Sequence, residues 1–312
     1  MPALITHDRF GKDLLKKGAA PFVSTDRECA AFLLGNQGPD PLFYCVASPS
    51  LWGYRKLGNL MHRNEPSALI MALLDSVDEV PASGRSIARA YVAGFLCHYL
   101  LDRAAHPLVY SQEFEICDAG IEGLTREDGT EVHAVIESEI DEVVLFTREG
   151  LTIADFKPHR EILRCDEQTL SIASYLVAIA TEKALKITTR FDLFAKSVHD
   201  FRLLQGAVFH SPRGVKRRVL GATERLLRSH SFLQAMTHRP IGEEYCRFDN
   251  HDNHPWTNPF TGDVSTASFQ DLFDRAQAEA QEALAILFDG SFSDQDAKRI
   301  TRNQNFSGEP VA

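Results

Sequence analysis

The most regular pattern in the chain is an apolar stretch from Ala88 to Pro107 that carries few polar side chains. Within it, His98, Asp102 and His106 recur at every fourth residue. Residues at this spacing lie on one face of an α-helix, about 6 Å apart along its axis, so the pattern predicts a buried helix with a polar ladder. Because proline disfavours helical geometry at the residue before it, we expect the helix to end at His106.

The polar ladder has two interpretations. An imidazole and a carboxylate four residues apart can bind one metal ion, whereas the structural alternative treats these groups as hydrogen-bonded polar side chains of a core helix. Burying an unpaired histidine together with an unpaired aspartate is costly. Three such residues in register therefore favour the metal site.

Helical periodicity recurs along most of the remaining chain. Thr130 can cap a helix on which His133, Glu137 and Asp141 repeat the four-residue spacing. No segment alternates apolar and polar residues as a half-buried strand would, and there is no internal repeat. Further helices are expected at residues 7–17, 29–34, 66–78, 131–146, 166–206, 212–231 and 265–287.

These elements predict an all-α fold, a multi-helix globular domain. Residues 1–290 are expected to form a single domain, in which 1–150 carry the candidate ligands and 151–290 complete the helical body. The tail at 291–312 is expected to fray.

Two irregular segments interrupt the helices. Gly35–Pro41 can only be a loop, and it holds Asp40 between two prolines. Residues 236–264 have no sustained period and contain His251, His254 and Trp256. A connection of this length is usually functional or mobile, so both a lid over a site and a surface loop remain open.

Composition narrows the classes of function. The formal charge of the 312 residues is -10, which argues against a surface that wraps duplex nucleic acid. The six cysteines form no CxxC pair, no stretch is long and apolar enough to span a membrane, and the N-terminus lacks the apolar core of a signal peptide. We therefore expect a cytoplasmic protein. The basic residues of 212–231 indicate a solvated face, or contact with phosphate or membrane.

The candidate ligands come from several segments and are all histidine or carboxylate. Nitrogen and oxygen ligands are preferred by zinc and, less selectively, by manganese or iron. In chain order the set is His7, Asp40, His62, His98, Asp102, His106, His133 and Glu137.

The order and spacing of this set resemble the zinc-dependent phospholipase C family, which is related to the fungal zinc-dependent single-strand nucleases. The similarity rests on H-x3-D at His98 and Asp102, a following His106, and H-x3-E at His133 and Glu137, within residues 1–140. It implies an all-helical protein with two or three zinc ions.

Carried over by position, the resemblance assigns the ligands to separate ions. One ion would be bound by Asp40, His62, His98 and Asp102. A second would be bound by His106, His133 and Glu137. A third would be shared between Asp102 and His7, with either the Pro2 amine, after removal of Met1, or Asp8 completing it.

The implied activity is hydrolysis of a phosphodiester, with phospholipids among the candidate substrates and Asp40 orienting or deprotonating the attacking water. Choline-preferring relatives carry aromatic side chains where this chain has Pro41 and Asn59, so a choline headgroup is not implied. Glu131 and Asp141 are interpreted as solvent-facing acids, with hydrogen bonding to ligand imidazoles as the alternative.

Two other functions are compatible with the sequence. The doublets His7-Asp8, His199-Asp200 and His251-Asp252 suggest an HD-type phosphohydrolase, which would leave His98 and Glu137 unexplained. A non-catalytic, metal-stabilised helical binding protein would keep the metal without the reaction.

Overall fold

The computed structural model describes residues 4–226 and 230–311. The helices of the first half are α1 Leu4–Lys16, α2 Asp26–Gly35, η1 Asp40–Val46, η2 Pro49–Tyr54, α3 Leu57–Arg63, α4 Pro66–Val77, η3 Ala82–Gly84, α5 Arg85–Asp118, η4 Arg126–Asp128 and α6 Gly129–Glu149. The second half contains α7 Pro158–Glu161, α8 Glu167–Leu185, α9 Leu193–Leu204, η5 Gln205–Phe209, α10 Val215–Glu224, α11 Phe232–Ala235, β1 Trp256–Thr257, β2 Val264–Ser265, α12 Phe269–Ile286 and α13 Asp294–Thr301.

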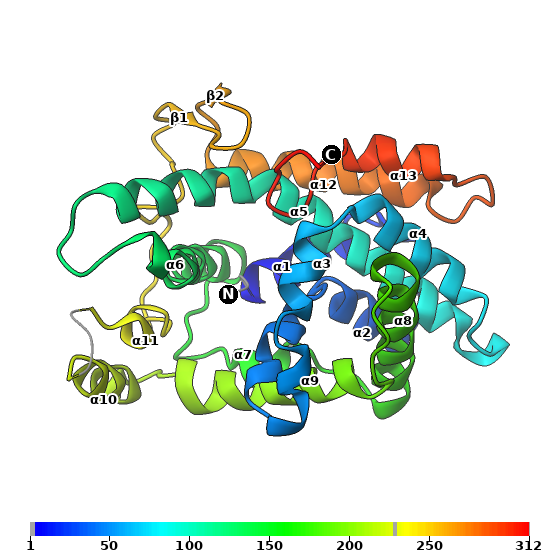
Figure 1. Ribbon diagram of the computed structural model, residues 1–312, viewed down its shortest axis with the longest axis horizontal. Helices are drawn as coiled ribbons and strands as arrows, with labels where there is room; N and C mark the ends of the chain where they lie inside the picture. The colour runs from blue at the N-terminus through cyan, green and yellow to red at the C-terminus, as the bar shows by residue number, and fades with distance from the viewer. Residues whose placement is uncertain (1–3, 227–229, 312) are drawn as a thin grey trace.

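The prediction of an all-α fold is confirmed. Among the described residues, the only sheet is the short antiparallel pair β1 and β2. Figure 1 shows α5 crossing the molecule, with α12 and α13 along one side and α2 and α4 near its first half. Within the described part of the chain, every helix is too short or too polar to cross a membrane.

The central helix α5 is longer than its sequence predicts. It runs for 34 residues, from Arg85 to Asp118, and passes through Pro107 instead of ending at His106. A proline removes one backbone hydrogen bond and crowds the preceding turn. Tertiary packing outweighs this cost, because Pro107 is itself buried and contacts the C-terminal segment at Gly308.

Helix α2 crosses α5 with almost no space between the two backbones. A methyl group added at Gly35 would lie 2.1 Å from Tyr91 O, and one at Gly94 would lie 2.0 Å from Phe32 O. Each glycine therefore admits the main chain of the other helix. The crossing fixes the start of the loop at 36–39, which follows α2 directly and leads to Asp40.

The C-terminal segment is ordered and buried, so the expected fraying is wrong. Residues 294–301 form α13, and Phe306 beyond it is only 1% exposed. Its ring lies 5.0 Å from that of Tyr99 on α5, and its backbone nitrogen donates to His62 O at 3.2 Å. A single phenylalanine after a short polar helix gave no periodicity from which this contact could be predicted.

Other helix boundaries differ in detail. The predicted helix 166–206 is divided into α8 and α9 at Lys186, which adopts a left-handed conformation with φ 59°. The predicted helix 212–231 is α10, only ten residues long, and Arg228 of that prediction lies outside the described residues.

We predict that Gly94→Ala destabilises the protein by several kcal/mol, because its methyl group cannot be placed without separating α2 from α5. Thermal or urea unfolding measures the change. Gly53→Ala is the matched control, since an added methyl at Gly53 meets nothing within 4 Å. Equal stability of the two variants would contradict the close crossing.

The cap of α2 gives a pH-dependent prediction. Hydrogen bonds from Ser24 N, at 2.9 Å, and from Thr25 N, at 3.0 Å, lower the pKa of Glu28 from 4.5 to about 2. A carboxylate with a depressed pKa stabilises the fold above its ordinary pKa, and the contribution disappears as pH falls through the lower value. We expect Glu28→Gln to cost about 1 kcal/mol at neutral pH, a difference that narrows between pH 4.5 and about 2 in urea unfolding. A constant difference across that range would contradict the interpretation.

Candidate metal centre

The eight residues of the candidate ligand set meet in one buried cluster, although they come from five helical elements and a span of 131 residues in the sequence. Three groups within it bring their ligand atoms within 4.8 Å of one another, and each could hold a metal ion. The groups are His7, Asp40 and His98; His62, His98 and Asp102; and His106, His133 and Glu137.

Asp102 lies at the middle of the cluster and presents its two oxygens to different imidazoles. Its Oδ1 atom lies 3.0 Å from His7 Nε2 and 3.7 Å from His106 Nε2. Its Oδ2 atom lies 3.1 Å from His98 Nε2 and 3.7 Å from His62 Nε2. This carboxylate is therefore placed to serve two neighbouring cations.

Asp40 approaches the cluster from the loop after α2. Its Oδ1 atom lies 3.1 Å from His62 Nε2 and 3.8 Å from His98 Nε2, and the residue is 3% exposed. The loop passes close to His98 because Gly38 has no side chain: a methyl group there would lie 2.1 Å from the imidazole. Gly38 also has φ 51°, which favours glycine.

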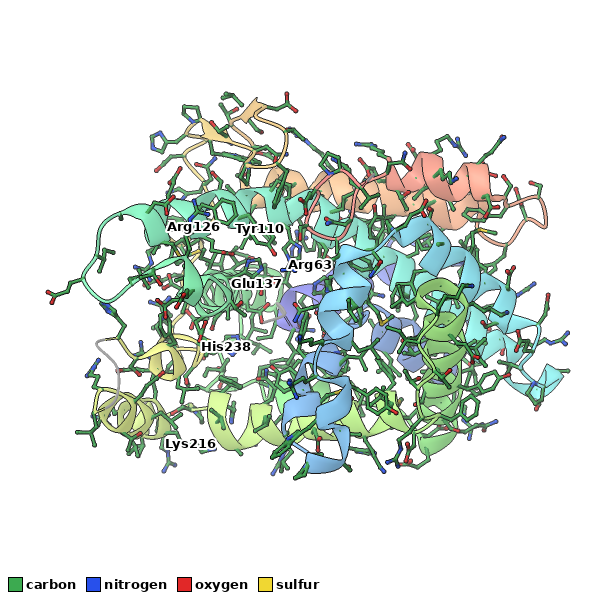
Figure 2. All side chains as sticks on the ribbon, in the orientation of Figure 1. Arg63, Tyr110, Arg126, Glu137, Lys216 and His238 are labelled. Carbon is green, nitrogen blue, oxygen red and sulfur yellow. The ribbon has the colours of Figure 1, made fainter. Side chains whose placement is uncertain are left out.

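Glu137 of α6 lies between the two imidazoles of its ligand group, His106 and His133. Its Oε1 atom lies 3.4 Å from both His106 Nε2 and His133 Nε2. Figure 2 shows Glu137 on α6 close to Tyr110 of α5, whose ring lies 4.8 Å from that of His133. The polar side chains at four-residue spacing on α5 and on α6 therefore meet at one site.

Four of the five imidazoles are held at the opposite ring nitrogen. The Nδ1 atom of His62 donates to Gly58 O at 2.8 Å, and that of His98 donates to Asn36 O at 3.2 Å. A carbonyl oxygen can only accept a hydrogen bond, so Nδ1 carries the proton in both rings. In the neutral form, each Nε2 then presents a lone pair to the cluster.

The hydrogen-bond acceptors of the other two rings, His106 and His133, lie far from them in the sequence. His106 Nδ1 donates to Phe306 O at 2.8 Å, and His133 Nδ1 donates to Glu113 Oε2 at 2.9 Å. Hydrogen bonds of this kind orient ligand imidazoles and fix their tautomer. Glu113 was not identified from the sequence, although its position seven residues after His106 places it on the same face of α5.

The cluster contains groups that could hold a cation. His98 Nε2 is buried without a hydrogen bond, although it lies 3.1 Å from Asp102 Oδ2, because the atoms face each other without donor geometry. Zinc binds such ligands tetrahedrally at about 2.0–2.2 Å, which sets neighbouring ligand atoms about 3.3–3.6 Å apart. The nitrogen–oxygen distances in the cluster run from 3.0 to 3.8 Å and so bracket that spacing, and the two contacts of Glu137, at 3.4 Å, fall within it.

The protonation equilibria reflect the same demand for positive charge. Burial opposes the charged form of His106, but Asp102 and Glu137 raise its pKa to about 9. Burial likewise opposes the charged form of His7, and Asp102 raises its pKa above the ordinary value. Although burial alone would raise the pKa of Asp102, the imidazoles of His106, His98 and His7 hold it well below its usual range.

Asp141 is neither solvent-facing nor a partner of a ligand imidazole, so both interpretations of it are wrong. It is 1% exposed and accepts hydrogen bonds from Ile5 N at 3.1 Å and Thr6 N at 2.7 Å. On its other side, His238 Nε2 lies 3.3 Å away. Asp141 therefore fixes the first turn of α1, which carries His7.

Two groups were predicted to complete the site of the third ion, Asp8 and the Pro2 amine, and their outcomes differ. Asp8 points away from the cluster and pairs with Lys12 at 2.9 Å, so it is not brought to His7. The Pro2 amine lies outside the described residues. Among those described, His7 Nδ1 is buried without a hydrogen-bond partner. Glu131, the other predicted surface acid, is half-buried at the start of α6.

The segment 236–264 reaches the cluster through a residue that the sequence did not single out. Phe260 contacts Tyr110 with ring centroids 5.2 Å apart. The residues expected to form a lid lie elsewhere: His251 and His254 are exposed, and the Trp256 indole donates to Ala267 O at 3.0 Å. Among the described residues, the doublets His199-Asp200 and His251-Asp252 contribute to none of the three ligand groups, and His199 is exposed.

Comparisons of this chain with models of protein families, with curated proteins and with solved structures give no match.

We predict that Glu113→Gln weakens metal binding to the group of His106, His133 and Glu137 by about 10–100-fold, because His133 loses its charged hydrogen-bond partner. Zinc titration of chelator-treated protein measures the effect. Glu115→Gln, an exposed change on the same helix, is the control and should leave the affinity unchanged. The orienting role would be excluded if both variants bound zinc as tightly as the unaltered protein.

Proposed function

We propose that this protein is a zinc-dependent phosphoric diester hydrolase of the phospholipase C type. One observation carries the proposal: imidazole Nε2 atoms converge on Asp40, Asp102 and Glu137, while hydrogen bonds at Nδ1 hold four of the rings from behind. Histidine and carboxylate ligands without thiolates suit zinc. Comparison with known proteins adds no support.

The number of ions in the proposal follows from the grouping of ligands. The group of His62, His98 and Asp102, with Asp40 beside it, would hold one zinc ion, and the group of His106, His133 and Glu137 would hold another. Asp102 Oδ1, which faces His7 and His106, supports a third site shared with His7. Bound together, such ions polarise a phosphate, lower the pKa of water and stabilise charge on the leaving oxygen.

The proposed reaction is attack of water on the phosphorus atom of a phosphodiester. The water oxygen forms a bond to phosphorus, the bond from phosphorus to the leaving oxygen breaks, and the water proton is passed to that oxygen. Asp40 is the candidate base, because its carboxylate enters the cluster from a loop while its Oδ1 atom faces His62 and His98. Its place between Pro39 and Pro41 limits the motion of the backbone.

The surroundings of the cluster favour a substrate that approaches from the side of the less buried ligands. The side chains of His62, His106 and His133 are 11–13% exposed, while that of His98 is fully buried. Phe43, with its ring 5.0 Å from that of His62, lies beside the most exposed of these side chains. Phospholipids, nucleotides and phosphomonoesters are all compatible with this arrangement.

We predict that the purified protein hydrolyses bis-p-nitrophenyl phosphate, that chelation removes the activity, and that zinc restores it. Asp40→Asn should lower kcat about 10²–10⁴-fold, as expected for loss of a general base. Release of p-nitrophenol and metal analysis of each variant measure the two effects. Fewer than two metal ions per chain, together with no chelator-sensitive hydrolysis, would refute the proposal.

One variant separates the proposed enzyme from an HD-type phosphohydrolase. Replacing His199 and Asp200 with alanine should leave hydrolysis intact, because His199 is exposed and neither residue belongs to the metal-ligand groups found among the described residues. Loss of activity in this variant would favour the HD-type enzyme. If chelation unfolds the protein and no phosphoester is hydrolysed, the cluster is structural and the protein is a metal-stabilised binding protein.

A further inference from the structure

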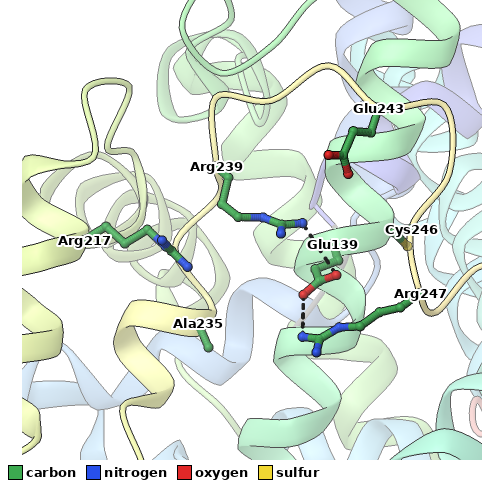
Figure 3. A pocket seen from close by; sticks show the side chains of 7 residues that line it. All are labelled: Glu139, Arg217, Ala235, Arg239, Glu243, Cys246 and Arg247. Carbon is green, nitrogen blue, oxygen red and sulfur yellow. Dashed lines mark hydrogen bonds and ion pairs between the residues drawn. The ribbon is translucent and has the colours of Figure 1, made fainter.

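Helix α10 has an inner face that is fully used for packing. It lies against α11 at Gly221, where an added methyl group would be 2.0 Å from Gln234 Oε1. From the same side, Arg217 Nε donates to Gln234 O at 3.0 Å. Figure 3 shows Arg217 at the edge of a cavity of about 410 Å³ that also contains Arg239 and Arg247.

Two of the three arginines of that cavity, Arg239 and Arg247, are paired with acids. Arg247 Nη2 lies 2.7 Å from Glu139 Oε1, and Arg239 Nη2 lies 2.7 Å from Glu142 Oε2. These pairs leave no excess of positive charge from either residue. The outer face of α10, by contrast, exposes apolar side chains.

That outer face is an apolar stripe. Val215, Val219 and Ala222 follow one another at intervals of four and three residues, which places them on one side of α10 within an arc of about 60°. Val215 is 54% exposed, Val219 is 57% exposed, and Leu226, in the turn after the helix, is 84% exposed. The stripe lies opposite the face that packs on α11.

Basic side chains flank the stripe on both sides. By helical position, Arg218 lies along one edge and Lys216 along the other, and Arg225 follows in the turn after the helix; all three are exposed. Two of them also bind neighbouring segments, since Lys216 Nζ donates to Gly206 O at 2.6 Å and Arg225 Nη2 donates to Gln234 Oε1 at 2.7 Å. Lys216 is at the periphery of the molecule in Figure 2. The acidic residue of this helix, Glu224, accepts hydrogen bonds from Ser231 Oγ and Leu233 N. A cationic surface thus stands out from a chain with a net charge of -10.

We propose that the outer face of α10 binds the surface of an anionic phospholipid bilayer, with the helix lying parallel to the membrane. Apolar side chains flanked by lysine and arginine enter the boundary between headgroups and acyl chains, while the cations contact the phosphates. An acidic protein would be attracted by the same charges, but attraction by charge alone gives no role to the exposed valines and leucine. An anionic bilayer accounts for both the basic side chains and the exposed apolar side chains.

This inference stands apart from the proposed hydrolysis. Binding of α10 to a vesicle uses none of the residues of the metal cluster, so chelator-treated and zinc-loaded protein should bind vesicles equally well. Failure of either proposal leaves the other in place. If both hold, α10 brings a phosphodiester hydrolase to the lipid surface.

Vesicle flotation tests the proposal with the full chain. The protein should float with vesicles of phosphatidylcholine and phosphatidylserine, bind much less to phosphatidylcholine alone, and dissociate as salt is raised. Val219→Glu should weaken binding on the order of tenfold, by removing an inserted apolar group and adding repulsion. Arg218→Ala should weaken it about fivefold.

Val264→Glu is the matched control, because Val264 is 69% exposed on β2, which lies at the top of the view in Figure 1 while α10 lies at the bottom. It should bind vesicles as the unaltered protein does, and circular dichroism of each variant checks the fold. The proposal is overturned if the unaltered protein does not float with anionic vesicles. It is also overturned if Val219→Glu and Val264→Glu bind alike, or if α10 is required only for binding an acidic protein.

Discussion

The candidate site depends on how the carboxylate oxygens of Asp102 and the imidazole nitrogens around it face one another as hydrogen-bond acceptors. Its two oxygens face Nε2 atoms of four imidazoles, and hydrogen bonds to carbonyl oxygens assign the proton of three of these rings to Nδ1. Two acceptors that face each other in a buried site repel unless a cation lies between them. Protonation of the imidazoles can supply that charge, as the raised pKa of His106 shows, and a metal ion can supply more of it.

The backbone makes this arrangement possible by bringing distant segments unusually close. Gly35 and Gly94 allow α2 to touch α5, and the loop that follows α2 then delivers both Asn36 O, which holds His98, and Asp40. In the C-terminal segment, the carbonyl oxygen of Phe306 accepts a hydrogen bond from His106 Nδ1. The positions of His98 and His106 are therefore set by main-chain atoms of another segment, which are harder to displace than side chains.

Periodicity was sufficient to predict the parts of the site that lie on α5 and α6. The four-residue spacing of His98, Asp102 and His106 survives in α5, and that of His133 and Glu137 survives in α6. The anchors could not be predicted in this way, because a carbonyl oxygen such as Phe306 O has no signature in a sequence. Pro107 shows the converse limit: its local preference to end a helix is real, but contacts from the C-terminal segment outweigh it.

The ligands differ in exposure, and the difference gives them different tasks. The His98 side chain is fully buried and that of His7 is 3% exposed, so neither can contact a molecule arriving from solvent. His62 and His133, at 13% and 11%, border the accessible side, and Asp40 lies between the two regions beside His62. A cation held jointly by buried and accessible ligands would be fixed from behind, with its outer side directed toward solvent. Asp102 joins the two regions, because each of its oxygens faces one deeply buried imidazole and one partly exposed imidazole.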